Sequence, residues 1–149
     1  MMGLTHTLVG LIRALIGKGY WAGDSLAIAM VMLGALLPDI DSENSLLGRK
    51  VKAVARLLEH RGFTHSLAGM LVFVALIQAA LYVTGIQTSI AAFMYGYLSH
   101  LAIDALTVKG IEPFYPLKIR IQGPIETNSI YEKLIFTMLL TIAVKMVYF

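Results

Sequence analysis

The histidines of this chain lie beside other polar residues, although most of the surrounding sequence is apolar. They occur in the segments THTLVG, EHRGFTHS and SHLAID, and they are His6, His60, His65 and His100. Carboxylates accompany them: Asp39 and Asp41 lie in LLPDIDSENS, and Asp104 closes SHLAID. Imidazole and carboxylate ligands without thiolate suit zinc, manganese or iron better than magnesium. The residue types therefore predict a divalent metal site, with zinc as the first choice and room for one or two ions.

The spacing of these residues supports the same interpretation. His100 and Asp104 are four positions apart, so on a helix they share one face and can bind one ion. Asp39 and Asp41 follow a proline that stops a helix, where two carboxylates can point at one cation or bridge two. His65 is expected at the start of a helix, with the preceding histidine in the loop before it.

The composition indicates where such a site would lie. Of the 149 residues, 58% are apolar and 14% are charged, and the mean hydropathy is +0.76. Since soluble domains usually contain about a quarter charged residues, disorder, a coiled coil and an ordinary water-soluble enzyme are all disfavoured. The chain has no cysteine, which excludes a disulfide framework. With a net charge of +3, anionic lipid is a better expected partner than nucleic acid, and no nucleic acid is expected.

Apolar segments then predict the elements that position the site. A spanning helix needs ~20 residues, and strand-like alternation is absent. The fold class predicted is all-α, an integral membrane bundle of about five helices within a single domain, residues 1–149. The expected helices cover residues 4–16, 26–37, 67–83, 89–106 and 134–149. Ser129 and Glu132 form a capping box ahead of the last of them.

Two long polar connections, residues 39–64 and 107–132, carry most of the basic residues and are therefore expected on the cytoplasmic side. In the first, Val51, Val54, Ala55 and Leu58 follow an i, i+3, i+4, i+7 pattern. This pattern predicts an amphipathic helix on the membrane surface, and a solvated basic loop is the alternative. Anionic headgroups are expected near Arg49, Lys52 and Arg56.

Alternating helices bring the polar motifs to one membrane face. His6 opens the first helix, Asp39 and Asp41 follow the second, His65 opens the third, and His100 with Asp104 closes the fourth. Every one of these ends lies on the side of the two long loops. The predicted metal ligands are His6, Asp39, Asp41, His65, His100 and Asp104.

Each ligand also has a simpler structural explanation. Asp39 and Asp41 are common turn and cap residues after a proline. His6 could be an aromatic residue of the membrane interface. His100 and Asp104 could be a satisfied polar pair between helices, although ionisable groups inside a membrane helix are costly and usually functional.

The set of motifs resembles a known family. TH-xxx-G at Thr5 to Gly10, LLPDID at Leu36 to Asp41, HRGFTHS at His60 to Ser66 and GYLSHLAIDALTVKG at Gly96 to Gly110 look like those of the YdjM-like inner-membrane proteins. Those proteins are described as membrane-bound metal-dependent hydrolases, distantly similar to zinc-dependent phospholipase C and the P1-type nucleases. The resemblance implies that His6, Asp39, His65, His100 and Asp104 are metal ligands.

The zinc phospholipases, however, use a terminal tryptophan amine and an HxxxH pair. This chain has its tryptophan at an internal position and no two histidines four apart. A trinuclear zinc site is therefore not expected, and a family label alone is a weak guide to the reaction.

These observations lead to two functional hypotheses. The first is a hydrolase that cleaves a phosphoester of a lipid or membrane-associated substrate with a metal-activated water. In it, Asp41 is a general base or bridging ligand, and His60 and Arg61 bind the phosphate or protonate the leaving group. The second is a non-enzymatic metal-binding membrane protein, namely a sensor, a scaffold or a cation carrier. A homo-oligomer is possible in either case.

Overall fold

A computed structural model describes residues 3–17, 20–21, 24–57 and 61–148. The described residues contain six α-helices and short 3-10 helices, with two isolated β-bridges and no named strand. The α-helices are α1 (Gly3–Ile16), α2 (Ser25–Leu36), α3 (Lys52–Leu57), α4 (Leu67–Thr84), α5 (Ile90–Ala105) and α6 (Ile130–Tyr148). The 3-10 helices are η2 (Leu37–Asp41), η3 (Gly48–Lys50) and η4 (Phe63–His65). The all-helical prediction is confirmed for these residues.

Polar residues set the ends of the helices that carry the site. Asp24 caps α2, since its carboxylate accepts hydrogen bonds from the backbone N–H groups of Leu26 and Ala27 at 3.1 and 3.0 Å. Ser66 caps α4 by accepting from the N–H of Gly69 at 3.0 Å. The Ser66 cap fixes where η4 gives way to α4, and therefore where the side chain of His65 lies.

The closest helix packing is between α2 and α5. A Cβ atom on Gly96 would lie 2.0 Å from the carbonyl oxygen of Val31, and one on Gly34 would lie 2.1 Å from that of Phe93. The two backbones therefore meet with no side chain between them at these points. Val31 and Phe93 are fully buried beside the contact. This approach holds the end of α5 against the end of α2.

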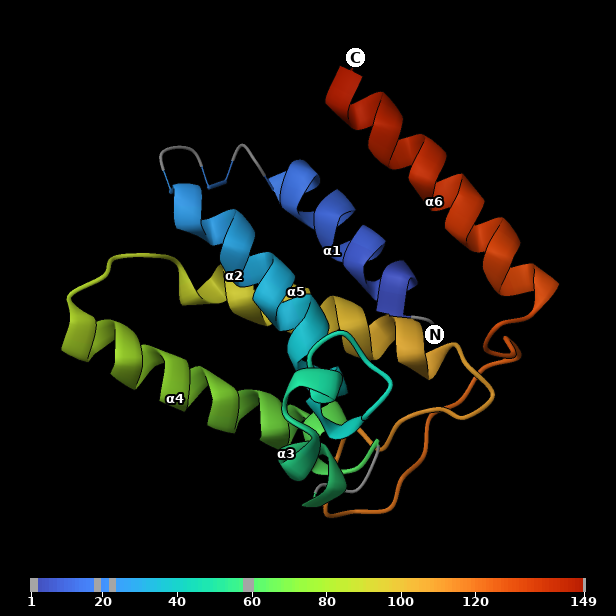
Figure 1. The fold of residues 1–149 in the computed structure, drawn as a ribbon, viewed down its shortest axis with the longest axis horizontal. Helices are drawn as coiled ribbons and strands as arrows, with labels where there is room; N and C mark the ends of the chain where they lie inside the picture. The colour runs from blue at the N-terminus through green and yellow to red at the C-terminus, as the bar shows by residue number, and fades with distance from the viewer. Residues whose placement is uncertain (1–2, 18–19, 22–23, 58–60, 149) are drawn as a thin grey trace.

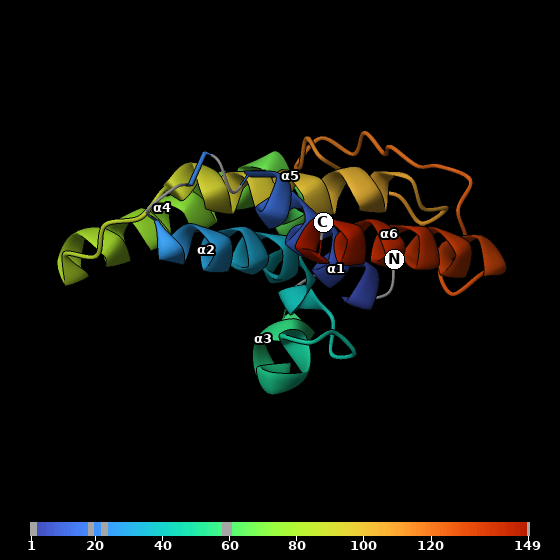
Figure 2. The same cartoon turned by 90° about the horizontal axis from the view of Figure 1, so that it is seen from above.

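Figure 1 shows that the long helices run side by side with alternating direction. The beginnings of α1, α4 and α6 and the ends of α2 and α5 lie at the same end of the molecule, where the long connections also lie. Figure 2 shows these helices as one flattened layer, from which α3 projects on one side. The alternation predicted from the sequence is thus present.

The C-terminal helix is joined to the first by a buried carboxylate. Glu132 is fully buried, and its Oε1 accepts from the hydroxyl of Thr5 at 3.1 Å. Its Oε2 accepts from the N–H of Asn128 at 2.6 Å, and its own N–H donates to Oγ of Ser129 at 3.3 Å. The pair therefore caps α6 as expected, and Glu132 also holds α6 beside the start of α1.

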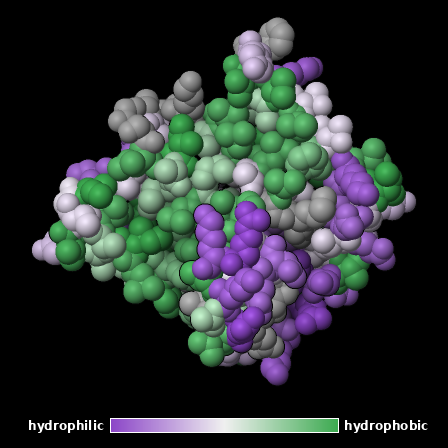
Figure 3. Space-filling view, in the orientation of Figure 1, coloured by the Kyte–Doolittle hydropathy of each residue, from purple (hydrophilic) through white to green (hydrophobic). Residues whose placement is uncertain are grey.

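One helix of the described part of the chain, α4, is long and apolar enough to cross a membrane. Only 11% of its 18 residues are buried within the molecule, so it is not the core helix of a soluble fold. Figure 3 shows extensive apolar surface over the helical layer. The expected bundle of five spanning helices is therefore not confirmed, although helices form at all five predicted positions.

The amphipathic helix expected around residues 51–58 is present in its described part as α3. α3 has six residues. Ala55 is buried, as its place in the apolar pattern requires, whereas Val51 of the same pattern is 40% exposed. Leu58 and the side chain of Val54 lie outside the described residues. Arg56 pairs with Glu43 at 3.0 Å, and whether α3 rests on a membrane stays a prediction.

Candidate metal centre

The predicted ligands come together at the end of the molecule where the helix ends converge. His6 comes from α1, Asp39 and Asp41 from η2, His65 from η4, and His100 with Asp104 from α5. Five of the six are buried, and the side chain of Asp39 is 15% exposed. Three overlapping groups of these residues offer ligand atoms within 4.8 Å of one another. Among these six side chains, that of Asp39 therefore lies closest to the surface of the described structure.

Two imidazole nitrogens form the middle of the cluster. Nε2 of His65 lies 3.2 Å from Nε2 of His100. Asp39 Oδ1 is 3.7 and 3.8 Å from these nitrogens, and Asp104 Oδ2 is 3.6 and 4.0 Å from them. Ligand atoms ~2.0–2.2 Å from a tetrahedral zinc ion lie roughly 3.3 Å apart. Three of these atoms at a time, as in the group of His65, His100 and Asp104, therefore lie near the spacing that one divalent ion requires.

His6 adds a fifth candidate ligand. Its ring stacks on that of His100 with a centroid separation of 3.9 Å, and its Nε2 lies 3.2 Å from Asp104 Oδ1. Its Nδ1 is buried and makes no hydrogen bond to another described residue. Asp104 therefore turns one oxygen toward His6 and the other toward His65 and His100, an arrangement that suits one ion or two.

Contacts at the Nδ1 atoms of His65 and His100 set the orientation of their rings. His100 Nδ1 lies 2.7 Å from the carbonyl oxygen of Ala35, which can only accept, so this nitrogen carries the proton. His65 Nδ1 lies 3.1 Å from Asp41 Oδ2. Metal-binding histidines usually donate their other N–H to a carbonyl or carboxylate in this way. Both rings consequently present Nε2 to the centre.

Asp41 itself is held by several donors. Besides His65, its Oδ2 accepts from the hydroxyl of Thr64 at 2.5 Å and from the N–H of Arg61 at 2.9 Å. The hydroxyl of Tyr97 in turn donates to the carbonyl oxygen of Thr64. Neither Thr64 nor Tyr97 is among the site residues predicted from the sequence. Tyr97 precedes His100 by three positions, so its place on the same face of α5 was the available signal.

The charges of the cluster stabilise one another. Burial lowers the pKa of His65, but Asp39 and Asp41 outweigh it and raise this pKa to about 9. For Asp39, burial acts to raise the pKa, and His65, His100 and His6 together hold it below its ordinary value. Without a metal, the two carboxylates therefore favour the protonated form of His65. A divalent cation would take the place of that proton.

Arg61 lies between the cluster and the surface. Its Nη2 is 3.0 Å from Asp104 Oδ2, while Nη1 donates to the hydroxyl of Thr107 at 2.9 Å and to the carbonyl oxygen of Gly110 at 2.7 Å. Its backbone has a φ of +65°, which non-glycine residues adopt rarely and often at functional sites. His60, the other predicted donor, lies outside the described residues.

Comparison with known proteins identifies the family. The model of the YdjM inner membrane protein family matches residues 1–148. The chain belongs to this family. It is 36% identical to the uncharacterized protein YvsG of Bacillus subtilis over 91% of this chain and 87% of YvsG. It is 33% identical to the inner membrane protein YdjM of Escherichia coli over 66% of this chain.

The chain matches about half, 53%, of the length of Escherichia coli YdjM. No solved structure matches the chain significantly. Membership of the YdjM inner membrane protein family supports a membrane location and agrees with the apolar surface of α4. The names of these relatives state no reaction.

A substitution of Asp41 tests its orienting role in this YdjM-family protein. Asp41→Asn removes the charge that His65 Nδ1 faces, and we expect the affinity for zinc to fall by about 10- to 100-fold, as for other outer partners of metal ligands. Isothermal titration calorimetry of the purified protein would measure it. Glu43→Gln is the matched control, because Glu43 pairs with Arg56 away from the cluster. An unchanged affinity in Asp41→Asn would contradict the role.

Proposed function

We propose that this protein is a membrane-bound metal-dependent hydrolase that cleaves a phosphoester of a lipid or membrane-associated substrate at the cytoplasmic face. The observation that carries the proposal is the cluster of three imidazoles and two carboxylates, with two of its rings oriented so that their Nε2 atoms meet. Burying this many ionisable groups without a compensating cation is costly. A divalent metal supplies that compensation.

The types of the ligand atoms indicate which metal ion the cluster would bind. Nitrogen and oxygen donors favour zinc, with manganese or iron as alternatives. The residues that would bind one or two such ions are His6, Asp39, His65, His100 and Asp104. When bound, a divalent ion supplies a water of lowered pKa and polarises a phosphoryl oxygen.

The remaining residues have separate roles. Asp41 keeps His65 in place, and its contacts with three donors favour this orienting role over that of a general base or bridging ligand. Asp39 lies at the exposed edge, where water and substrate reach the centre. Arg61 is the donor to a phosphoryl oxygen, since its guanidinium already contacts the cluster. His60 keeps the role inferred from the sequence.

The basic loop gives the proposed enzyme a lipid partner. Arg49 and Lys52 are exposed, and Arg56 is exposed beside Glu43. Basic residues near an anionic leaflet each contribute about 1 kcal/mol of attraction. This surface would keep anionic headgroups near the end of the molecule that holds the cluster.

One observation favours a second function. All the clustered residues except Asp39 are buried, and closed sites of this kind are typical of structural metals. The alternative is therefore a non-enzymatic metal-binding membrane protein, that is, a sensor, a scaffold or a cation carrier.

A release assay separates the two functions. Purified protein loaded with zinc or manganese is incubated with vesicles of different phospholipids, and released phosphate and headgroup are measured. We expect metal-dependent release that a chelator abolishes and His100→Ala eliminates, whereas Glu126→Gln, an exposed loop variant, retains it. Bound metal without any release would favour the non-enzymatic function.

A further inference from the structure

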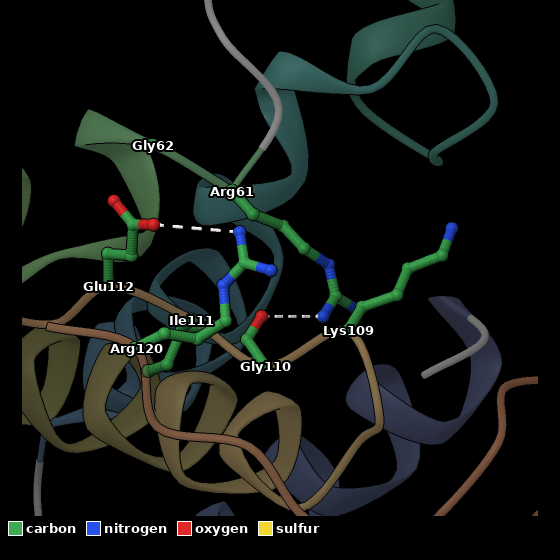
Figure 4. A pocket seen from close by; sticks show the side chains of 7 residues that line it. All are labelled: Arg61, Gly62, Lys109, Gly110, Ile111, Glu112 and Arg120. Atoms are coloured by element: carbon green, nitrogen blue, oxygen red, sulfur yellow. Dashed lines mark hydrogen bonds and ion pairs between the residues drawn. The ribbon is translucent and has the colours of Figure 1, made fainter. Parts of the chain in front are cut away.

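A second polar feature adjoins the metal cluster. A pocket of about 260 Å³ is lined by the cationic side chains of Arg61, Lys109 and Arg120, with Glu112 as the acidic residue among its lining. Figure 4 shows the guanidinium of Arg120 turned toward Glu112, and Lys109 extending on the other side of Arg61. Arg120 lies 3.6 Å from Glu112, so the pocket keeps an excess of positive charge.

Arg61 links this pocket to the cluster. One end of its guanidinium is engaged by Asp104, Thr107 and Gly110. Its Nε is buried and makes no hydrogen bond to any other residue that the structure describes. Nε–H and one Nη2–H lie on the same edge of a guanidinium, the edge that binds two oxygens of a phosphate or carboxylate side by side. Arg61 therefore has one hydrogen-bond donor, Nε–H, with no partner among the described residues. This donor lies on the edge of the guanidinium whose geometry suits an oxyanion.

The backbone around the pocket is fixed. Gly110 has a φ of +63°, and a Cβ at this position would lie 2.4 Å from the carbonyl oxygen of Ile121. Ile111 and Ile121 exchange two backbone hydrogen bonds of 2.9 Å, which hold the segments that carry Lys109 and Arg120 together. The cations are thus brought together by the packing of two loop segments, as in a formed site.

We propose that this pocket binds the phosphate group of the substrate and presents it to the metal cluster. Lys109 and Arg120 provide charge from the loop, and Arg61 provides hydrogen bonds beside Asp104. A phosphate monoester has three peripheral oxygens and more negative charge than a carboxylate, so it matches three cations better. The role as a substrate site rests on the proposed function, whereas the binding of phosphate does not.

The test is a titration of the metal-free, full-length protein in detergent with inorganic phosphate, followed by calorimetry. We expect Lys109→Gln and Arg120→Gln each to weaken binding about 3- to 10-fold, with a larger loss in the double variant and in added salt. Lys118→Gln is the matched control, because Lys118 is exposed on the same loop but does not line the pocket. Absence of phosphate binding, or an equal loss in Lys118→Gln, overturns the proposal.

Two further ligands identify the source of the phosphate. Glycerol 3-phosphate represents a soluble ester, and short-chain phosphatidic acid represents a lipid headgroup. If either ligand binds more weakly to the Lys109 and Arg120 variants, the proposal is supported and that ligand identifies the source. If the affinities for both ligands are unchanged in these variants, the proposal is overturned.

Asp39→Ala separates this proposal from the preceding one. This variant should lose metal affinity but keep phosphate binding, since Asp39 does not line the pocket. If the protein binds phosphate through these cations but hydrolyses no substrate, only the proposed hydrolase function is refuted. If the protein hydrolyses substrate but does not bind phosphate through these cations, only the proposed role of the pocket is refuted.

Discussion

Replacing Asp104 with asparagine is expected to leave the purified protein almost free of zinc, with a dissociation constant raised more than about 100-fold. Asp104 contributes one oxygen toward His6 and the other toward His65 and His100. An amide has a single oxygen and no charge, so it cannot serve both sides. Since outer partners of ligands already account for about 10- to 100-fold in affinity, loss of a ligand that faces three histidines should exceed that range. Elemental analysis and zinc titration would measure it.

Asp24→Asn is the matched control for this experiment. Asp24 is also an aspartate at a helix end, but it caps the start of α2, at the opposite end of that helix from the cluster. Its carboxylate accepts from Thr88 and Ser89, so the variant should lower thermal stability without changing metal content. Full zinc occupancy in Asp104→Asn, with helical content retained in both variants, would show that the ion binds elsewhere.

The convergence of the candidate metal ligands could be predicted because it depends only on the direction in which each helix runs. Consecutive apolar helices that pack side by side run in opposite directions. The start of one helix and the end of the next therefore lie on the same side of the bundle. His6 and His65 at helix starts, and His100 at a helix end, follow from this without any knowledge of side-chain geometry. The structure brings them together as expected.

The roles of individual residues could not be predicted in the same way. Asp41 lies behind His65 because the 3-10 turns η2 and η4 aim both side chains, and the direction of such turns is not evident from composition. Arg61 reaches Asp104 from a backbone with positive φ, which the sequence does not indicate for an arginine. The pocket over Arg61 depends on contacts between residues far apart in the chain.

The lengths of two described helices explain why the predicted bundle of five spanning helices is not confirmed. α1 has 14 residues and α2 has 12, which correspond to about 21 and 18 Å at ~1.5 Å per residue. Both are shorter than the ~30 Å hydrocarbon core. Their apolar composition therefore predicts spanning helices, although their lengths do not reach that thickness. Among the described residues, only the 18-residue α4 is both long enough and apolar enough to span.

Gly96→Ala is expected to destabilise the protein and to weaken metal binding together. The added methyl would lie 2.0 Å from the carbonyl oxygen of Val31 and 3.0 Å from the backbone nitrogen of Ala35, so α5 has to move away from α2. Alanine in place of glycine favours a helix by about 1 kcal/mol, and overpacking typically costs ~1–3 kcal/mol or more. Since the clash is with backbone, which cannot rotate away as a side chain can, the cost should exceed the gain.

The movement should also reach the metal. His100 lies one turn beyond Gly96, and its Nδ1 depends on the carbonyl oxygen of Ala35 at 2.7 Å. Separation of α2 and α5 lengthens this hydrogen bond and turns Nε2 from the cluster, so we expect zinc affinity to fall about tenfold alongside a lower melting temperature. Ala91→Val enlarges an exposed residue of the same helix and should change neither quantity appreciably. A Gly96→Ala protein that melts higher than the parent, as helix propensity alone would predict, would mean that α2 and α5 do not pack with their backbones in contact.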